Sequence, residues 1–163
     1  MCDADPVDLK DPETGKMVER ASARANALVE MIDQRNGVVI IPAPVLAEYL
    51  IGISQDAYQA QLDLMNSFSC IEISPFDDMS AIECALLVDE QEHKVLDPNA
   101  TKAKLRFDRQ ILAIALANGA DELWTHDKGL FFKAKASGVT TKSLAKIAPL
   151  PDQKSLDLPP DED

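Results

Sequence analysis

Short apolar runs that alternate with helical patterns predict an α/β fold with a parallel sheet. Residues 38–41 and 71–73 are rich in β-branched side chains, and Gly, Pro or Ser stands beside each run, as expected of buried strands. A third run, residues 122–125, directly follows a long helical pattern. Strands in this order need helical crossovers between them, so they are expected to run parallel with right-handed connections.

Helical periodicity accounts for the segments between these strands. An apolar stripe predicts a helix over residues 16–34, which Asn36 and Gly37 end. Pro44 is suited to the first turn of the next helix. The remaining elements are expected in this order: helices over residues 56–68 and 77–94, a short helix over 130–136, and an edge strand over 139–141.

Length and composition indicate one domain. The chain has 163 residues, and residues 1–148 are expected to form a single domain. Residues 149–163 are rich in Pro and acidic residues, which predicts a disordered tail. Three cysteines without paired spacing indicate a reducing compartment, and no apolar run is long enough for a membrane span, so a cytoplasmic protein is expected.

The stretch from Lys104 to Leu130 organises the chain. It reads as a buried helix over residues 107–117, a stop at Asn118 and Gly119, and a buried strand. Asp108 stands at the start of this helix, and Asp127 follows the strand. Buried helices seldom carry an acid there unless it caps, pairs or binds a cation.

Topology places two of the candidate acids at one edge of the predicted sheet. Ligands of such sheets bind beyond the carboxyl ends of the strands, where Glu48 and Asp127 follow their strands. Asp108 begins the helix that leads into the third strand, which puts it on the opposite side unless the helix begins earlier, near Thr101. Topology alone does not bring the three acids together.

Charge is distributed unevenly along the chain. The net charge is −12, which argues against indiscriminate nucleic-acid coating. Residues 101–146 nevertheless carry nine Lys or Arg and four Asp or Glu, a net charge of +5 around the organising stretch. A solvated helix face and a phosphate-binding face explain this excess equally well.

Three motifs in order resemble the PIN domain family over residues 16–148. They are Ile40-Ile41-Pro42-Ala43-Pro44-Val45-Leu46-Ala47-Glu48-Tyr49-Leu50, Ile71-Glu72-Ile73-Ser74-Pro75-Phe76-Asp77 with Ala81, and Lys104-x-x-x-Asp108-x-x-Ile111-x-Ala113-x-Ala115 with Gly119-Ala120-x-x-Leu123-x-Thr125-x-Asp127. The resemblance implies a three-layer α/β/α fold with a central parallel sheet. It also implies cleavage of single-stranded RNA with Mg²⁺ or Mn²⁺, as by toxins of the VapC type. Such toxins have a cognate antitoxin as partner and are often homodimers.

The same resemblance assigns roles to particular residues. Glu48, Asp108 and Asp127 become the catalytic, metal-binding acids, because hard cations take carboxylate oxygens. Thr125 becomes a second-layer residue that bonds a ligand or water. Lys104, Arg109 and Lys128 become contacts for RNA phosphates.

The chain departs from the family at its beginning. The family opens with a strand that ends in an acid and lies centrally in the sheet, and nothing before residue 16 reads so. The hypothesis is that the first strand is missing and that translation was assigned from an internal Met. Upstream codons that encode an aliphatic strand with an Asp would support it, and a stop codon directly before Met1 would remove it.

Ordinary readings compete with these assignments. Asp108 can form a helix ion pair with Lys104, and Asp127 can simply start a turn. Glu48 outside its motif would be a solvated helix residue. The alternative function is therefore a non-catalytic PIN-like module that binds RNA or a protein partner. A small-molecule enzyme is a distant third, because no Gly-rich phosphate loop or nucleophile elbow occurs.

Overall fold

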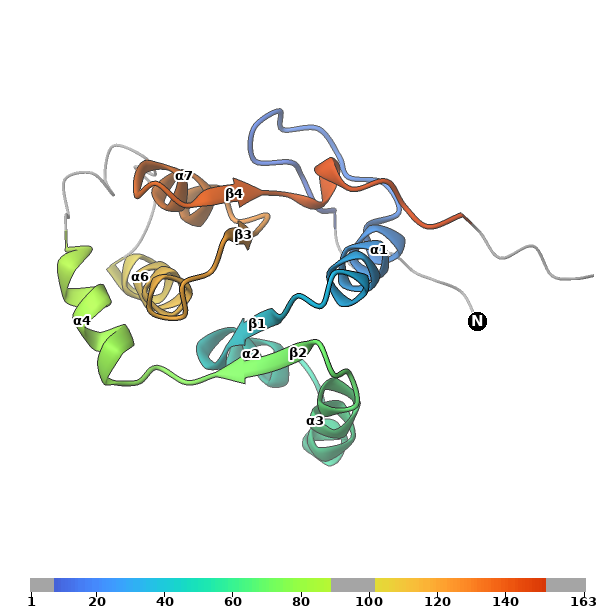
Figure 1. Cartoon of the computed structure of the whole chain (residues 1–163), viewed down its shortest axis with the longest axis horizontal. Helices are drawn as coiled ribbons and strands as arrows, with labels where there is room; N and C mark the ends of the chain where they lie inside the picture. Colours follow the sequence, from blue (N-terminus) through green and yellow to red (C-terminus); the bar gives the residue numbers. More distant parts are fainter. Residues whose placement is uncertain (1–7, 89–101, 152–163) are drawn as a thin grey trace, which may run out of the picture.

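The computed structural model describes residues 8–88 and 102–151. Parallel strands and helices alternate along them, which confirms the predicted α/β class (Figure 1). The strands are β1 (Val39–Pro42), β2 (Ile71–Ser74), β3 (Glu122–Trp124) and β4 (Thr140–Lys142). The α-helices are α1 (Ala21–Gln34), α2 (Ala43–Ile51), α3 (Tyr58–Asn66), α4 (Asp78–Leu86), α6 (Lys102–Ala117) and α7 (Lys128–Ala136), with short 3₁₀ turns η1 (Gln55–Ala57) and η2 (Leu144–Lys146).

Helix α1 begins five residues later than the predicted start at residue 16. The backbone N–H of Val18 donates to the carbonyl of Leu9, and Lys10 forms an isolated antiparallel bridge with Met17. These contacts hold residues 16–18 extended. Arg20 then takes a left-handed conformation, with φ of 56°, as the helix N-cap. The apolar periodicity could not show this, because the extended segment carries the same residue types.

Helix α6 begins earlier than residue 107, as the alternative start near residue 101 required. Asp108 therefore lies in its second turn instead of its first. Gly119 follows the helix with φ of +62°, a left-handed conformation that ends it as predicted. Helix α4 ends at Leu86 with Leu87 as its C-cap, so the predicted helix over residues 77–94 was placed too long, and residues 89–94 lie outside the described residues.

The densest packing lies around α6, β3 and α7. Leu112 is fully buried there and packs with Ile111, Leu123, Leu130 and Ala134. Helices α2 and α3 contain no buried residue, so the other half of the molecule is more open. None of the helices in the described ranges combines the length and apolar composition needed to cross a bilayer.

The parallel strands form two separate sheets of two strands each. β1 pairs with β2, and β3 pairs with β4. Within the described residues β1 pairs only with β2, and β3 pairs only with β4. Each of these strands therefore keeps one edge without a strand partner in this part of the chain, and such an edge presents backbone groups to solvent or to another strand.

The two sheets are not aligned as halves of one parallel sheet. Asn118, just after α6, donates a 3.0 Å hydrogen bond to Ser74, the last residue of β2. The carboxyl end of β2 therefore lies beside the point where the chain enters β3. In Figure 1 the arrows of β2 and β4 accordingly point in opposite directions. Glu48, which follows β1, belongs to the end of the first sheet that meets Asn118.

The segment before α1 is anchored to the β4 side of the molecule. Ser143 Oγ and Thr14 Oγ1 each donate a 2.7 Å hydrogen bond to Asp11. His126 accepts from the backbone N–H of Leu144 and contacts the Lys10 carbonyl. The Thr14 hydrogen bond is the largest influence on Asp11 and, with that from Ser143, it lowers the pKa of this carboxyl despite burial. This network ties the loop to the end of β4.

Truncation of the fully buried Leu112 to Ala should destabilise the fold by about 2–5 kcal/mol, because it leaves a cavity inside the α6 core. Chemical denaturation monitored by circular dichroism measures the loss. The matched control is Leu64→Ala on α3, where Leu64 is 53% exposed, and it should change stability by less than about 0.5 kcal/mol. Equal losses in both variants would contradict the location of the core.

Replacement of Asp11 by Asn should remove stability that depends on pH. The folded-state pKa of Asp11 lies below its ordinary value of 3.8, so the carboxylate stabilises the fold above that pH. This contribution is lost as the pH falls through the lower folded-state pKa. Thermal melts of wild type and Asp11→Asn should therefore differ at pH 7 and converge below about pH 3.8. A difference that is constant from pH 7 to pH 2 would refute the role of the carboxylate.

Candidate functional site

Asp108 is a buried carboxylate on α6, the helix that carries Leu112 of the hydrophobic core. It is 4% exposed and stands one turn after Lys104 and just before the apolar run that packs on β3 and α7. A carboxylate at this depth is costly unless a cation or hydrogen-bond donors compensate it. The position of α6 thus places the Asp108 carboxylate next to the start of α7.

Asp127 is fixed at the start of α7. Its side chain caps the helix by accepting a 2.9 Å hydrogen bond from the backbone N–H of Leu130. Its own backbone N–H donates to the hydroxyl of Thr125 at 3.1 Å. Thr125 was predicted to support a ligand, and the structure places it where it holds the backbone of Asp127.

Lys104 joins the two acids. Its ammonium lies 2.9 Å from the Asp127 carboxylate and 3.4 Å from Asp108 Oδ2. The pairing of Lys104 with Asp108 along the helix was an ordinary reading of the sequence, whereas its bond to Asp127 joins residues 23 positions apart and could not be read from spacing. Asp108 and Asp127 therefore meet around one positive charge.

The pKa shifts agree with this arrangement. Burial is the largest influence on Lys104 and opposes its charge, but the hydrogen bonds and charges of Asp127 and Asp108 outweigh burial and raise its pKa. Burial is also the largest influence on Asp127 and tends to raise its pKa. The hydrogen bonds from the Leu130 N–H and Lys104 together outweigh burial, so the pKa of Asp127 is lowered. The ammonium and the Asp127 carboxylate are thus both charged at neutral pH.

Glu48 does not join this pair. It is exposed on α2, and within residues 8–88 and 102–151 no three side chains of Asp, Glu, His or Cys lie close enough together to hold a metal ion. The first sheet meets α6 near its C-terminal end, where Asn118 donates its hydrogen bond to Ser74. Asp108 lies ten residues before Asn118, or about 15 Å along the helix axis.

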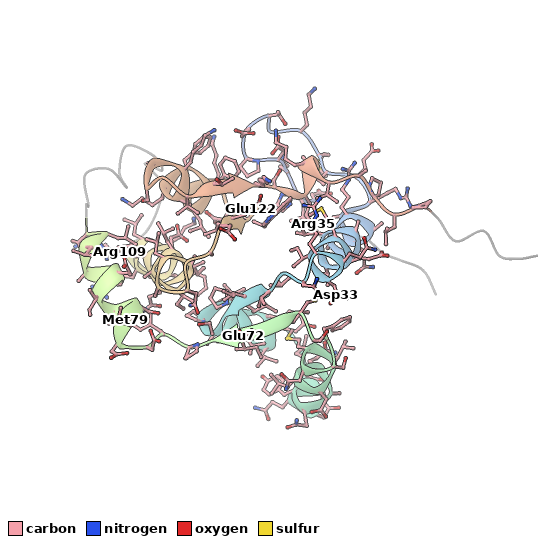
Figure 2. All side chains as sticks on the ribbon, viewed as in Figure 1. Asp33, Arg35, Glu72, Met79, Arg109 and Glu122 are labelled. Atoms are coloured by element: carbon pink, nitrogen blue, oxygen red, sulfur yellow. The ribbon has the colours of Figure 1, made fainter. Side chains whose placement is uncertain are left out.

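The other two predicted phosphate contacts lie near the pair. Lys128 is exposed at the first residue of α7, next to Asp127. Arg109 follows Asp108 on α6, and Figure 2 shows it where α6 lies beside α4. Neither position tests phosphate binding, so the role of both residues stays a prediction.

A second polar cluster surrounds Trp124 on β3. Glu122 pairs with Lys142 and accepts a 3.0 Å hydrogen bond from Trp124, and the Lys142 ammonium lies 5.5 Å from the centre of the Trp124 ring. The Lys142 hydrogen bond above all lowers the pKa of Glu122. The residues border a pocket of about 340 Å³ that has one acid, already paired. This pocket lacks the paired carboxylates of the Lys104 site.

The donor chemistry of the Lys104 site fits a hard divalent cation. Mg²⁺ keeps several waters and is commonly bound through one or two carboxylates together with phosphate oxygens of the substrate. Asp108 and Asp127 supply two carboxylates that already enclose a positive charge, the Lys104 ammonium. Two acids are thus enough for a ligand pair of this kind, although they do not form a complete protein cage.

Comparison with known proteins gives a family for the chain. No curated protein matches it. Among solved structures, a chain of the crystal structure of VapBC2 from Rickettsia felis bound to a DNA fragment from their promoter is similar, with 21% identity, a TM-score of 0.49, and coverage of 76% of this chain and 94% of that chain. The family model of the PIN domain matches residues 16–137. This range is most of the protein and includes both acids of the Lys104 site. The chain therefore belongs to the PIN domain family.

Proposed function

We propose that this protein is a Mg²⁺- or Mn²⁺-dependent endoribonuclease that cleaves single-stranded RNA, and that it is the toxin of a toxin–antitoxin pair acting in the cytoplasm. One observation carries the proposal: Asp108 and Asp127, far apart in the sequence, meet around a single cationic group in a partly buried site. Membership of the PIN domain family supports it.

In this proposal the residues of the Lys104 site have distinct tasks. Asp108 and Asp127 hold the ion, which when bound activates water and offsets charge on the phosphate. Thr125 keeps the backbone of Asp127 in place through its 3.1 Å hydrogen bond. Arg109 and Lys128 receive phosphates that flank the cleaved bond, without base specificity.

Glu48 is proposed to bind the ion or to orient the attacking water. That role requires a movement of α2 that brings Glu48 close to Asp108 and Asp127. The open edges of β1 and β3 and the scarcity of buried residues in α2 and α3 make such a movement less costly than a movement within the α6 core. Of the three proposed acids, Glu48 is the one that lies outside the Lys104 site.

The alternative proposal is a PIN-like module that binds a protein partner without catalysis. Met79, Ile82 and Leu86 form an exposed apolar stripe on α4, at 54%, 55% and 76% exposure. Residues 36–88 contain no Lys or Arg, and their seven acids are Glu48, Asp56, Asp63, Glu72, Asp77, Asp78 and Glu83. A basic, amphipathic partner such as an antitoxin suits this surface better than a second copy of the same acidic face.

Substitution of Asp108 by Asn should abolish RNA cleavage. The change removes a metal-binding charge but preserves shape, and several kcal/mol of transition-state stabilisation correspond to a loss of at least about 100-fold. Cleavage of a fluorescent single-stranded RNA with Mg²⁺ or Mn²⁺ measures it. The control is Asp121→Asn, which alters an exposed acid near the end of the same helix and should retain activity. Equal activity in both variants would exclude the proposed site, and an inactive wild type would favour the non-catalytic alternative.

Replacement of Ile82 by Asp should weaken binding of a cognate antitoxin by about tenfold or more, since central apolar anchors dominate such interfaces. Isothermal titration calorimetry measures the affinity. Leu64→Asp on α3 is the control, because Leu64 is similarly exposed but lies outside the α4 stripe. If Leu64→Asp weakens binding while Ile82→Asp does not, the partner binds elsewhere.

A further inference from the structure

We propose that Lys104 is an internal competitor for the divalent cation, an ammonium that must leave Asp108 and Asp127 before the ion can bind both acids. This inference rests on the proposed function, because it concerns the same pair of carboxylates. It assigns to Lys104 a role that precedes any contact with RNA.

The geometry shows why the ammonium and the ion compete. The Lys104 ammonium lies 2.9 Å from one carboxylate and 3.4 Å from the other, so it occupies the space between them. Both carboxylates are fixed, Asp108 by the packing of α6 and Asp127 by its cap on α7. An ion that contacts both acids must enter that same space, and two cations cannot share it.

Lys104 is also the member of the group that can move. Its side chain is 36% exposed, whereas that of Asp108 is 6% exposed, and that of Asp127, although 40% exposed, is held by the Leu130 N–H. The ammonium sits on a flexible four-carbon stem, which can extend into water without a change in the backbone of α6. Displacement therefore breaks the hydrogen bonds from the Lys104 ammonium to Asp127 and Asp108 and needs no rearrangement of the α6 core.

Displacement would give Lys104 a second task. An ammonium released from the acids stays within one side-chain length of them, where a phosphate flanking the cleaved bond would lie. Cation binding would then prepare the site for RNA, and RNA would favour the cation in return, since coupling between two ligands is reciprocal. Lys104 would thus pair with the two acids in the absence of the cation and contact an RNA phosphate once the cation is bound.

Metal-binding measurements on matched variants test this role. Mn²⁺ is titrated into wild type, Lys104→Met, Lys104→Arg and Lys128→Met, and free Mn²⁺ is followed by electron paramagnetic resonance. Loss of the competing bonds should lower the dissociation constant of Lys104→Met by about tenfold. Lys104→Arg keeps a competing cation, and Lys128→Met removes an exposed charge beside Asp127 without opening the space, so both should stay within about threefold of wild type.

A second measurement follows Lys104 itself in the wild-type protein and uses a variant only to assign its signal. In wild type labelled with ¹⁵N-lysine, the Nζ resonance of Lys104, assigned by comparison with Lys104→Arg, should move to the position of solvent-exposed lysines as Mg²⁺ saturates the site. A resonance that stays unchanged at saturation would overturn the inference. So would a dissociation constant of Lys104→Met that equals or exceeds that of wild type.

The outcome separates this inference from the proposed nuclease. If Lys104→Met binds Mn²⁺ more tightly but no variant cleaves RNA, Lys104 is a competitor in a protein that is not a nuclease. If wild type cleaves RNA and Lys104→Met binds Mn²⁺ no more tightly, the nuclease stands and the competitor role is wrong. If Lys104→Met binds no Mn²⁺ at millimolar concentration, the competitor role is overturned whatever the cleavage assay shows.

Discussion

The packing of α6 against β3 and α7 determines which charged side chains of this protein meet. Leu112, Leu123 and Leu130 fasten the three elements together, and this contact sets the position of Asp108 relative to Asp127. Without it, the two carboxylates would be independent side chains 19 positions apart in the sequence. Their mutual repulsion is offset by Lys104, so apolar burial brings the charges together and an ion pair keeps them there.

The sheet of β1 and β2 and the helices α2 and α3 are less buried than the core around α6. The sheet of β1 and β2 contributes only Ser74 to the buried residues of its strands, and the helices α2 and α3 contribute none. A β-branched strand that is only partly buried leaves apolar surface in reach of water, which suits a region that gains further cover from another strand or a partner. The single hydrogen bond from Asn118 to Ser74 is a modest constraint beside the interdigitated core of α6.

The sequence patterns and the structure agree most closely where the pattern is local. Aliphatic runs marked the strands to within one or two residues, and Gly119 ended α6 as predicted. The start of α1 was placed too early because Leu9 and Lys10 hold residues 16–18 extended through backbone contacts that leave no trace in periodicity. The resemblance to the PIN family pointed to Asp108 and Asp127 as metal-binding acids and to Lys104 as a contact for RNA phosphates. It did not show that Lys104 bonds both acids.

The sequence by itself determined the α/β class and the buried character of α6, because helix and strand periodicity and local capping depend on neighbours along the chain. Only the tertiary structure decided which charges meet. Lys104 reaches Asp127 across 23 residues, and Glu48 on α2 does not join the two acids. Such distances follow from how separate elements pack, and that packing is governed by the summed burial of many side chains and not by the spacing of any motif.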